Sequence, residues 1–385
     1  MRHDRKDNRM TDHGYQTRTW EELKAETLAR AERGAYPLFA ISSDDARAAL
    51  AMIHDLDPEA WGAAWMTVGD RHAERAQALE ASDTAGAAQA YLAAWRLYTF
   101  GRWPVMSSPK KVESYAKAQA AFAAYGRLVT PAIEPLSIPF EGRDIKLWLQ
   151  KPAGAARPPV TINIGGSDLW TDSVAIQARG FLPHGIAAIA VDKPGTADAP
   201  VPVRPGSERM ISAIIDHVQS RADLDGRRII VRGQSWGSYW SARAAYAERD
   251  RLKGAVFQSG PVHRYFQREW QQEAFKTREF LFDYVPSRLH MLGVASIEEA
   301  FAVMPSLSLL DGDLIEQPTP PMLLIGGARD TQVPFSDFVL MLEHGSPKHA
   351  WVNPAGQTMG RSLSVKDDDI FHEVVVPWVR HQFGW

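Results

Sequence analysis

The chain has 385 residues, 45% of them hydrophobic, which is enough for one large core and one additional module. Its 43 basic and 46 acidic residues give a net charge of −3 without a basic cluster interleaved with aromatics, which argues against a nucleic-acid partner. The absence of cysteine excludes disulfides, a thiolate metal site and a cysteine nucleophile.

The beginning of the chain is almost wholly polar, which predicts a disordered extension over residues 1–18. It has no apolar segment of the kind found in secretory signals, and no later run reaches membrane-spanning length. We therefore expect a cytoplasmic protein that does not enter a membrane.

Residues 19–130 contain no strand pattern and predict a helical N-terminal domain. Thr19 and Glu22 form a capping box at its start. The further helices are expected over residues 45–51, 61–81, 85–99 and 109–128. Aromatic side chains share helix faces at Trp61, Trp65, Tyr91, Trp95, Tyr98 and Tyr115. This spacing favours core packing over the alternative, direct contact with a substrate.

The pattern changes to period two at residue 133, and a hairpin over 133–140 and 145–149 is expected. Short apolar runs that end in glycine-bearing loops then alternate with helical stretches. These runs are 160–164, 187–191, 228–231, 254–258, 322–325 and 349–352. The alternation predicts an α/β fold for residues 131–385, with a doubly wound, mostly parallel sheet and its ligand site at the carboxyl ends of the strands.

Gly233-Gln-Ser235-Trp-Gly237 directly follows one of these runs and precedes a helical stretch. In an α/β-hydrolase this pattern is the nucleophile elbow, where a serine with strained backbone stands between strand and helix. Side chains at 233 and 237 would collide with neighbouring elements, so glycine is required at both. Ser235 is the expected nucleophile, against the alternative of an ordinary strand-to-helix turn.

A long, mostly helical insert over residues 262–318 interrupts the alternation and is predicted to be a lid. Together with the N-terminal helices, it is expected to cover an apolar pocket, because no other segments are long enough to do so.

A serine nucleophile needs an acid, a base and oxyanion donors. Asp330, in a loop after a strand, fits the acid, and the alternative is an Asx turn capping that loop. The expected oxyanion donors are the N–H of Trp236 and one from the Gly166-Ser167 loop.

The base is missing where the fold places it, because Gln357 stands in the loop after the last strand and an amide cannot take a proton at neutral pH. A register shifted by one residue would put Thr358 there instead, and its hydroxyl is no better a base. His372 in the final helix, 369–376, and His349 at a strand start are the nearest alternatives.

These motifs resemble the α/β-hydrolases with a helical N-terminal domain, which include 2,6-dihydroxypseudooxynicotine hydrolase, fungal polyketide-shortening hydrolases and fermentation-respiration-switch-type esterases. The resemblance covers most of the chain from about residue 60. It rests on Ala93–Tyr98, Pro109-Lys-Lys, Gly165-Gly-Ser-Asp168, Asp192-Lys-Pro-Gly195, Gly233–Gly237 and Gly326-Gly-Ala-Arg-Asp330.

The resemblance implies a hydrolase that forms an acyl-enzyme on Ser235, with Asp330 as triad acid and position 357 or 358 in place of the histidine. It implies cleavage of an ester, or of a C–C bond in a β-diketone-like aryl ketone or polyketide, without a cofactor or metal. Glu269 and Tyr265 are similar to a substrate-binding segment of the family.

We expect a small-molecule substrate and leave a homodimer open. The glutamine at 357 is either an engineered change or a natural loss, and the otherwise intact machinery favours the first. The alternative function is a non-catalytic ligand-binding protein on a hydrolase scaffold.

Overall fold

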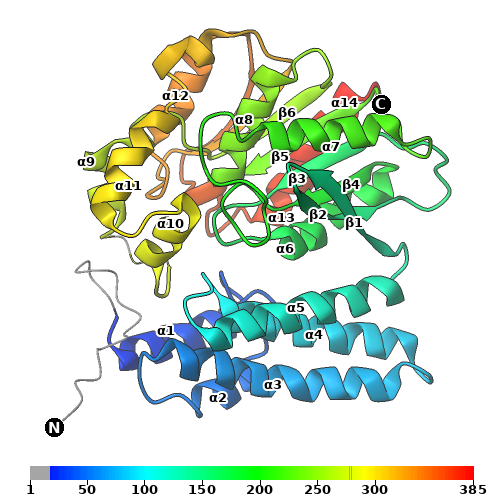
Figure 1. Cartoon of the computed structure of the whole chain (residues 1–385), viewed down its shortest axis with the longest axis vertical. Helices are drawn as coiled ribbons and strands as arrows, with labels where there is room; N and C mark the ends of the chain where they lie inside the picture. Colours follow the sequence, from blue (N-terminus) through cyan, green and yellow to red (C-terminus); the bar gives the residue numbers. More distant parts are fainter. Residues whose placement is uncertain (1–17, 277, 279) are drawn as a thin grey trace. The chain divides into compact units, whose positions relative to one another are not determined.

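The computed structural model describes residues 18–276, 278 and 280–385, and these form two compact units (Figure 1). One unit contains the described residues up to Ala132 together with Arg278–Ser287, and the other contains Ile133–Thr277 and Arg288–Trp385. The predicted extension over 1–18 lies outside the described residues except for Arg18. The insert expected at 262–318 is divided between the two units. The sequence predicted a single domain boundary near residue 130 and did not predict this division.

The first unit is helical. Its helices are α1 (Trp20–Arg33), α2 (Ser43–Leu50), α3 (Pro58–Leu79), α4 (Thr84–Arg102) and α5 (Pro109–Leu128). The capping box of Thr19 and Glu22 is confirmed at the start of α1. The six aromatic residues singled out in the sequence are all buried, with exposed fractions of 8% or less. Core packing is therefore their role, as the helical spacing favoured.

Residues 278–287, which we call the strap, complete the core of this helical unit. The ring of Phe282 lies edge-on to that of Trp61, with centroids 4.6 Å apart. Lys111 Nζ lies 3.2 Å from Asp283 Oδ2, and both side chains are buried. The guanidinium of Arg18 donates to backbone carbonyls of the strap. The strap is thus held by apolar, ionic and backbone contacts.

The second unit is built on an eight-stranded sheet with the order β1-β2-β4-β3-β5-β6-β7-β8. The strands are β1 (Ile133–Phe140), β2 (Arg143–Gln150), β3 (Val160–Ile164), β4 (Ala187–Val191), β5 (Ile229–Gln234), β6 (Gly254–Gln258), β7 (Met322–Gly327) and β8 (His349–Asn353). β1 and β2 form the predicted antiparallel hairpin, and β2 pairs antiparallel with β4. The remaining strands are parallel. The predicted α/β-hydrolase fold is therefore confirmed.

Helices accompany this sheet in the order that the sequence predicts. They are α6 (Thr171–Ala178), α7 (Arg209–Ser220), α8 (Trp236–Ala247), α12 (Phe335–Glu343), α13 (Asp367–Ile370) and α14 (Val376–Gln382). The insert contributes α9 (Arg268–Ala274), α10 (Tyr284–Leu292) and α11 (Ile297–Val303), and α10 carries the chain from one unit into the other. A π-helical turn at Phe371–Val375 interrupts the final helix, which the sequence predicted to be continuous.

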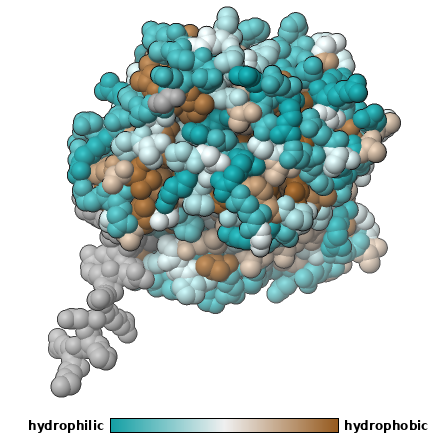
Figure 2. Space-filling view, turned by 45° about the horizontal axis from the view of Figure 1, so that its top comes forward, coloured by the Kyte–Doolittle hydropathy of each residue, from teal (hydrophilic) through white to brown (hydrophobic). Residues whose placement is uncertain are grey.

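The residues of the central strands β3, β4, β5 and β6 are buried throughout, which explains why these strands read as continuous apolar runs rather than as alternating ones. On the face shown in Figure 2, hydrophobic residues lie in small groups among hydrophilic ones. In the part of the chain that the structure describes, no helix is both long and apolar enough to cross a membrane.

Candidate active site

Ser235 stands alone between β5, which ends at Gln234, and α8, which begins at Trp236. Its backbone has φ 50° and ψ −123°, a conformation that a residue with a side chain rarely adopts. The backbone N–H of Ser235 donates to Gln258 O at 2.8 Å and fixes the turn to the neighbouring strand β6. The strained elbow predicted from the motif is confirmed.

The two glycines of the motif are required by close backbone approach. A Cβ atom on Gly233 would lie 2.2 Å from Gly237 O, inside the turn itself. One on Gly237 would lie 2.2 Å from Ile164 O, at the end of β3. Real Cβ atoms do not come this close to backbone oxygens, so any larger residue would push α8 away from the sheet.

The loop after β3 lies against the serine. A Cβ built on Gly166 would be 3.3 Å from Ser235 Cβ and 3.8 Å from its Oγ. Within the described residues, the backbone N–H of the next residue, Ser167, has no acceptor, although Ser167 is only 9% exposed. The N–H of Trp236 belongs to the first turn of α8, which leaves it without an intrahelical partner. Two donors are therefore available beside Ser235.

Asp330 lies in the loop after β7 and is tied to its own loop. Its Oδ1 accepts hydrogen bonds from the backbone N–H groups of Gln332 and Val333, at 2.8 and 3.0 Å. Its Oδ2 is buried and has no hydrogen-bond partner among the described residues. Burial raises the pKa of Asp330 above its usual range, and its hydrogen bonds oppose this shift. The Asx-type turn and a free, buried carboxylate oxygen thus coexist in one residue.

Thr358, rather than Gln357, meets this carboxylate. Thr358 Oγ1 donates to Asp330 Oδ1 at 3.1 Å, and Thr358 is 7% exposed. The side chain of Gln357 is exposed to solvent. Of the two registers that the sequence left open, Thr358 makes the hydrogen bond to Asp330, and none joins Gln357 to Asp330 within the described residues.

Neither histidine considered as an alternative base has a hydrogen bond to Ser235 or Asp330. His372 is 47% exposed and pairs with Asp368 at 3.5 Å. His349 accepts from the indole N–H of Trp378 at 2.8 Å. It also begins β8, so it lies at the end of the parallel sheet opposite to the loops that carry Ser235 and Asp330. Both are therefore poorly placed to act as the base.

The loop that carries Thr358 is fixed by residues distant in sequence. The side-chain amide of Gln258 donates to Met359 O at 3.0 Å, while its backbone carbonyl accepts from Ser235. Asn353 Nδ2 donates to Gly360 O at 2.8 Å. Met359 takes φ 62°, which is unusual for a residue other than glycine. Gln258, whose role the sequence did not reveal, thus joins the elbow to the Thr358 loop.

Tyr265 and Glu269, the residues expected to bind substrate, differ in their surroundings. Tyr265 is 1% exposed, and its hydroxyl accepts from the indole N–H of Trp236 at 2.8 Å. This contact ties Tyr265 to the first residue of α8, and a substrate contact by Tyr265 stays a prediction. Glu269, on α9, is exposed and has no hydrogen bond among the described residues.

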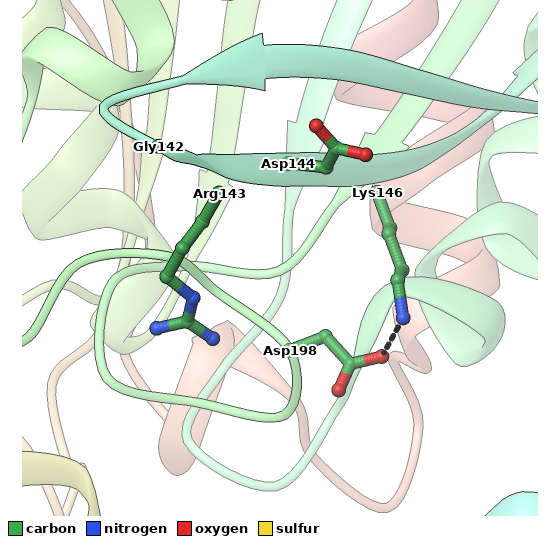
Figure 3. Close-up of a pocket in the computed structure, with 5 residues that line it drawn as sticks. All are labelled: Gly142, Arg143, Asp144, Lys146 and Asp198. Atoms are coloured by element: carbon green, nitrogen blue, oxygen red, sulfur yellow. Dashed lines mark hydrogen bonds and ion pairs between the residues drawn. The ribbon is translucent and has the colours of Figure 1, made fainter.

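A surface hollow of about 400 Å³ is lined by Gly142, Arg143, Asp144, Lys146 and Asp198 (Figure 3). In Figure 3, Arg143 and Lys146 extend from β2 toward the loop that carries Asp198. Lys146 Nζ pairs with Asp198 at 3.0 Å. Arg143 donates to Pro200 O at 3.2 Å, and Asp144 accepts from the hydroxyl of Ser137 at 2.7 Å. None of the five lining residues is a candidate nucleophile. It is therefore distinct from the site around Ser235.

Comparison with known proteins places this geometry in context. The chain matches the protein family described as FrsA-like esterases over residues 50–368. It is 25% identical to the hydrolase LUC6 of a Fusarium species, over 91% of this chain and 94% of that protein. It is 27% identical to the 20-hydroxy-prefusarin hydrolase FUS2 of Gibberella moniliformis, over 86% of this chain and 90% of that protein. The solved structure of 2,6-dihydroxy-pseudo-oxynicotine hydrolase is similar in fold, with a TM-score of 0.74, 19% identity, and coverage of 88% and 92% of the two chains.

Proposed function

Because the chain belongs to the FrsA-like esterase family, we propose that it is a hydrolase of small acyl compounds that uses Ser235 as its nucleophile. The observation that carries this proposal is the strained backbone of Ser235 beside the unbonded N–H of Ser167. A strained serine is costly to maintain and is characteristic of functional sites. Free donors next to it supply the stabilisation that a developing oxyanion needs.

In the proposed reaction, Ser235 Oγ attacks the substrate carbonyl carbon, and its proton passes to solvent water in the chain as it stands or to the imidazole in Thr358→His. The oxyanion forms next to the N–H groups of Ser167 and Trp236, and its collapse expels the leaving group and leaves an acyl-enzyme that water then hydrolyses. An ester would release an alkoxide that takes a proton on oxygen. A β-diketone-like aryl ketone or polyketide would release a carbanion that takes a proton on carbon. Both substrate classes fit a family that contains esterases and the relatives named above.

Thr358 determines how fast this reaction proceeds in the chain as it stands. Its hydroxyl bonds Asp330, but it is not a base at neutral pH. Loss of the triad base lowers kcat on the order of 10⁴- to 10⁶-fold in well-studied serine hydrolases. We therefore infer slow turnover that depends on the oxyanion donors and on binding.

The test is a matched pair of substitutions, Thr358→His and Gln357→His, assayed with p-nitrophenyl esters and with aryl β-diketones. Thr358→His should raise kcat on the order of 10²-fold or more, because it puts an imidazole next to Asp330, where a triad base would be oriented by that carboxylate. Gln357→His should leave kcat unchanged, because side chain 357 is exposed. Adding Ser235→Ala to Thr358→His should abolish the gain. An equal gain from both histidines would refute the assignment of position 358.

A second function, ligand binding without turnover, is favoured by one observation: a threonine rather than a histidine bonds Asp330, while its loop is held by hydrogen bonds. For this function, Thr358→His would bind the same aryl ketones as the unaltered chain but would not turn them over. Isothermal titration with a non-hydrolysable aryl ketone, run beside the kinetic assay, separates the two functions.

A further inference from the structure

Lys193 is a buried cation in the loop after β4 that points at the backbone beside the nucleophile. Its side chain is 1% exposed, and its Nζ donates to Gly166 O at 2.6 Å. The hydroxyl of Thr196 lies 3.4 Å from the same nitrogen and itself donates to Lys193 O at 2.9 Å. The ammonium is therefore held in one place, with its short hydrogen bond to the Gly166 carbonyl.

The Gly166 carbonyl and the Ser167 N–H belong to a single peptide group. A peptide is planar and almost always trans, so its C=O and N–H point in opposite directions. Any group that fixes the carbonyl of Gly166 also fixes the direction of the Ser167 N–H. A charged donor on the carbonyl also polarises the peptide and makes its N–H a stronger donor.

Fold stability alone is a poor explanation for this lysine. Taking an ammonium group out of water costs several kcal/mol, and a methionine of similar volume fills such a space without that cost. The neighbouring Asp192 offers partial compensation: burial raises its pKa to about 7, and Lys193 is among the groups that oppose this rise. A buried charge that is aimed at a backbone carbonyl next to Ser235 points instead to the chemistry of the site.

We infer that Lys193 is a positioning residue of the oxyanion hole, which orients and polarises the Gly166–Ser167 peptide so that the Ser167 N–H meets the developing oxyanion. This inference rests on the proposed function of Ser235. Lys193 itself does not touch the substrate, and it acts through the peptide that does.

The test measures covalent labelling of Ser235 by a fluorophosphonate, whose phosphoryl oxygen occupies the oxyanion position. Intact-protein mass spectrometry gives the maximal labelling rate and the half-saturating probe concentration separately. Lys193→Met should lower the maximal rate about 10- to 100-fold, because loss of one oxyanion donor costs about 10²- to 10³-fold and here the donor is weakened rather than removed. The half-saturating concentration should remain within about twofold. Labelling is measured both in the chain as given and in the Thr358→His background.

Two further variants give the comparison its controls. Lys146→Met removes an exposed lysine at the same edge of the sheet, and it should leave both labelling parameters unchanged. Lys193→Arg keeps a charged donor and should recover most of the rate lost in Lys193→Met. If Lys193→Met does not fold by circular dichroism, Lys193→Gln takes its place, since it retains a donor without the charge.

The outcomes distinguish this inference from the proposed function. If Ser235 is not labelled in either background, the proposed function fails and the inference fails with it. If Ser235 is labelled but Lys193→Met, or Lys193→Gln in its place, reacts as fast as its parent, the inference alone is wrong. It is also wrong if the half-saturating concentration rises while the maximal rate is unchanged, which would indicate a merely structural role.

Discussion

At the scale of single residues, Asp330 forms an Asx-type turn and still has one carboxylate oxygen without a partner among the described residues. Its Oδ1 organises the loop after β7 and receives Thr358, while its Oδ2 is buried without a partner. A carboxylate in this position is unfavourable in its charged form, which is why burial raises its pKa. The loop thus presents a buried carboxylate oxygen without a partner, and no histidine of the described residues forms a hydrogen bond with it.

This burial predicts a pH-dependent effect of Asp330→Asn on stability. The folded pKa lies above the unfolded value of about 3.9, so the carboxyl is neutral in both states in strong acid and burying it then has no ionisation cost. As the pH rises past about 4, Asp330 loses its proton in the unfolded chain but keeps it in the folded chain, which lowers the free energy of unfolding. This decrease continues until the pH passes the folded pKa of Asp330. Asparagine keeps the Oδ1 contacts but never ionises.

We therefore expect the melting temperature of Asp330→Asn, relative to the unaltered chain, to increase between pH 4 and pH 8. Differential scanning calorimetry across that range measures the difference. Asp250→Asn is the control, because the Asp250 side chain is 90% exposed and its replacement should give a flat difference. A difference for Asp330→Asn that stays flat or decreases toward pH 8 would show that burial does not raise the pKa of this carboxyl.

At the scale of elements, the start of the insert depends on one buried carboxylate. Asp337, at the beginning of α12, is completely buried and accepts the backbone N–H groups of four consecutive residues after β6, with distances of 2.7 to 3.1 Å. The last of these is Tyr265, which bonds Trp236 at the elbow. Asp337 therefore connects the insert to the turn at Ser235 and Trp236 through Tyr265.

Asp337→Asn should destabilise the protein by about 1–3 kcal/mol, because an amide NH₂ would face backbone N–H donors and leave at least one of them without an acceptor. Urea unfolding followed by tryptophan fluorescence measures the loss. Asp250→Asn again serves as the surface control. If Asp337→Asn were as stable as that control, the four hydrogen bonds would not anchor the insert.

Features that adjacent residues determine were predicted correctly from the sequence, and features that depend on residues far apart in the chain were not. The elbow was predictable because its strand, its two glycines and its serine occupy one short stretch, and local sterics dictate the turn. The contact of Thr358, rather than Gln357, with Asp330 was not predictable from the local sequence. It depends on the positive φ of Met359 and on Gln258, which lies about a hundred positions earlier in the chain. The role of Lys193 was hidden for the same reason: its acceptor, Gly166, lies in a different loop.

At the scale of the whole molecule, neither unit is a continuous stretch of chain. The strap belongs to the helical unit, although it is encoded in the insert of the sheet unit. Lys111 and Asp283 form a buried ion pair between α5 and the strap. Removing one of them leaves the charge of the other buried without its counter-charge. Burial lowers the pKa of Lys111, and Asp283 opposes that shift. The integrity of the helical unit thus depends on a contact between residues far apart in sequence.

A double-mutant cycle tests this dependence. Lys111→Met and Asp283→Asn should each destabilise the protein by about 3–5 kcal/mol, because each leaves a buried group without its partner. The double variant should lose less than the sum of the two, since it leaves no unpaired charge. Urea unfolding at neutral pH gives all four free energies. Strictly additive losses would mean that the two charges do not stabilise one another.

The late position of the strap also affects how the nascent chain matures on the ribosome. Helices α1 to α5 are synthesised first, but residues 278–287 follow only after β6. Until then, Trp61 lacks the ring of Phe282 and Lys111 lacks its carboxylate. Translation therefore delivers an incomplete helical unit with an exposed aromatic surface, which is a ligand for chaperones and a target for proteases. The helical unit is therefore made first but is complete only after synthesis has passed residue 287.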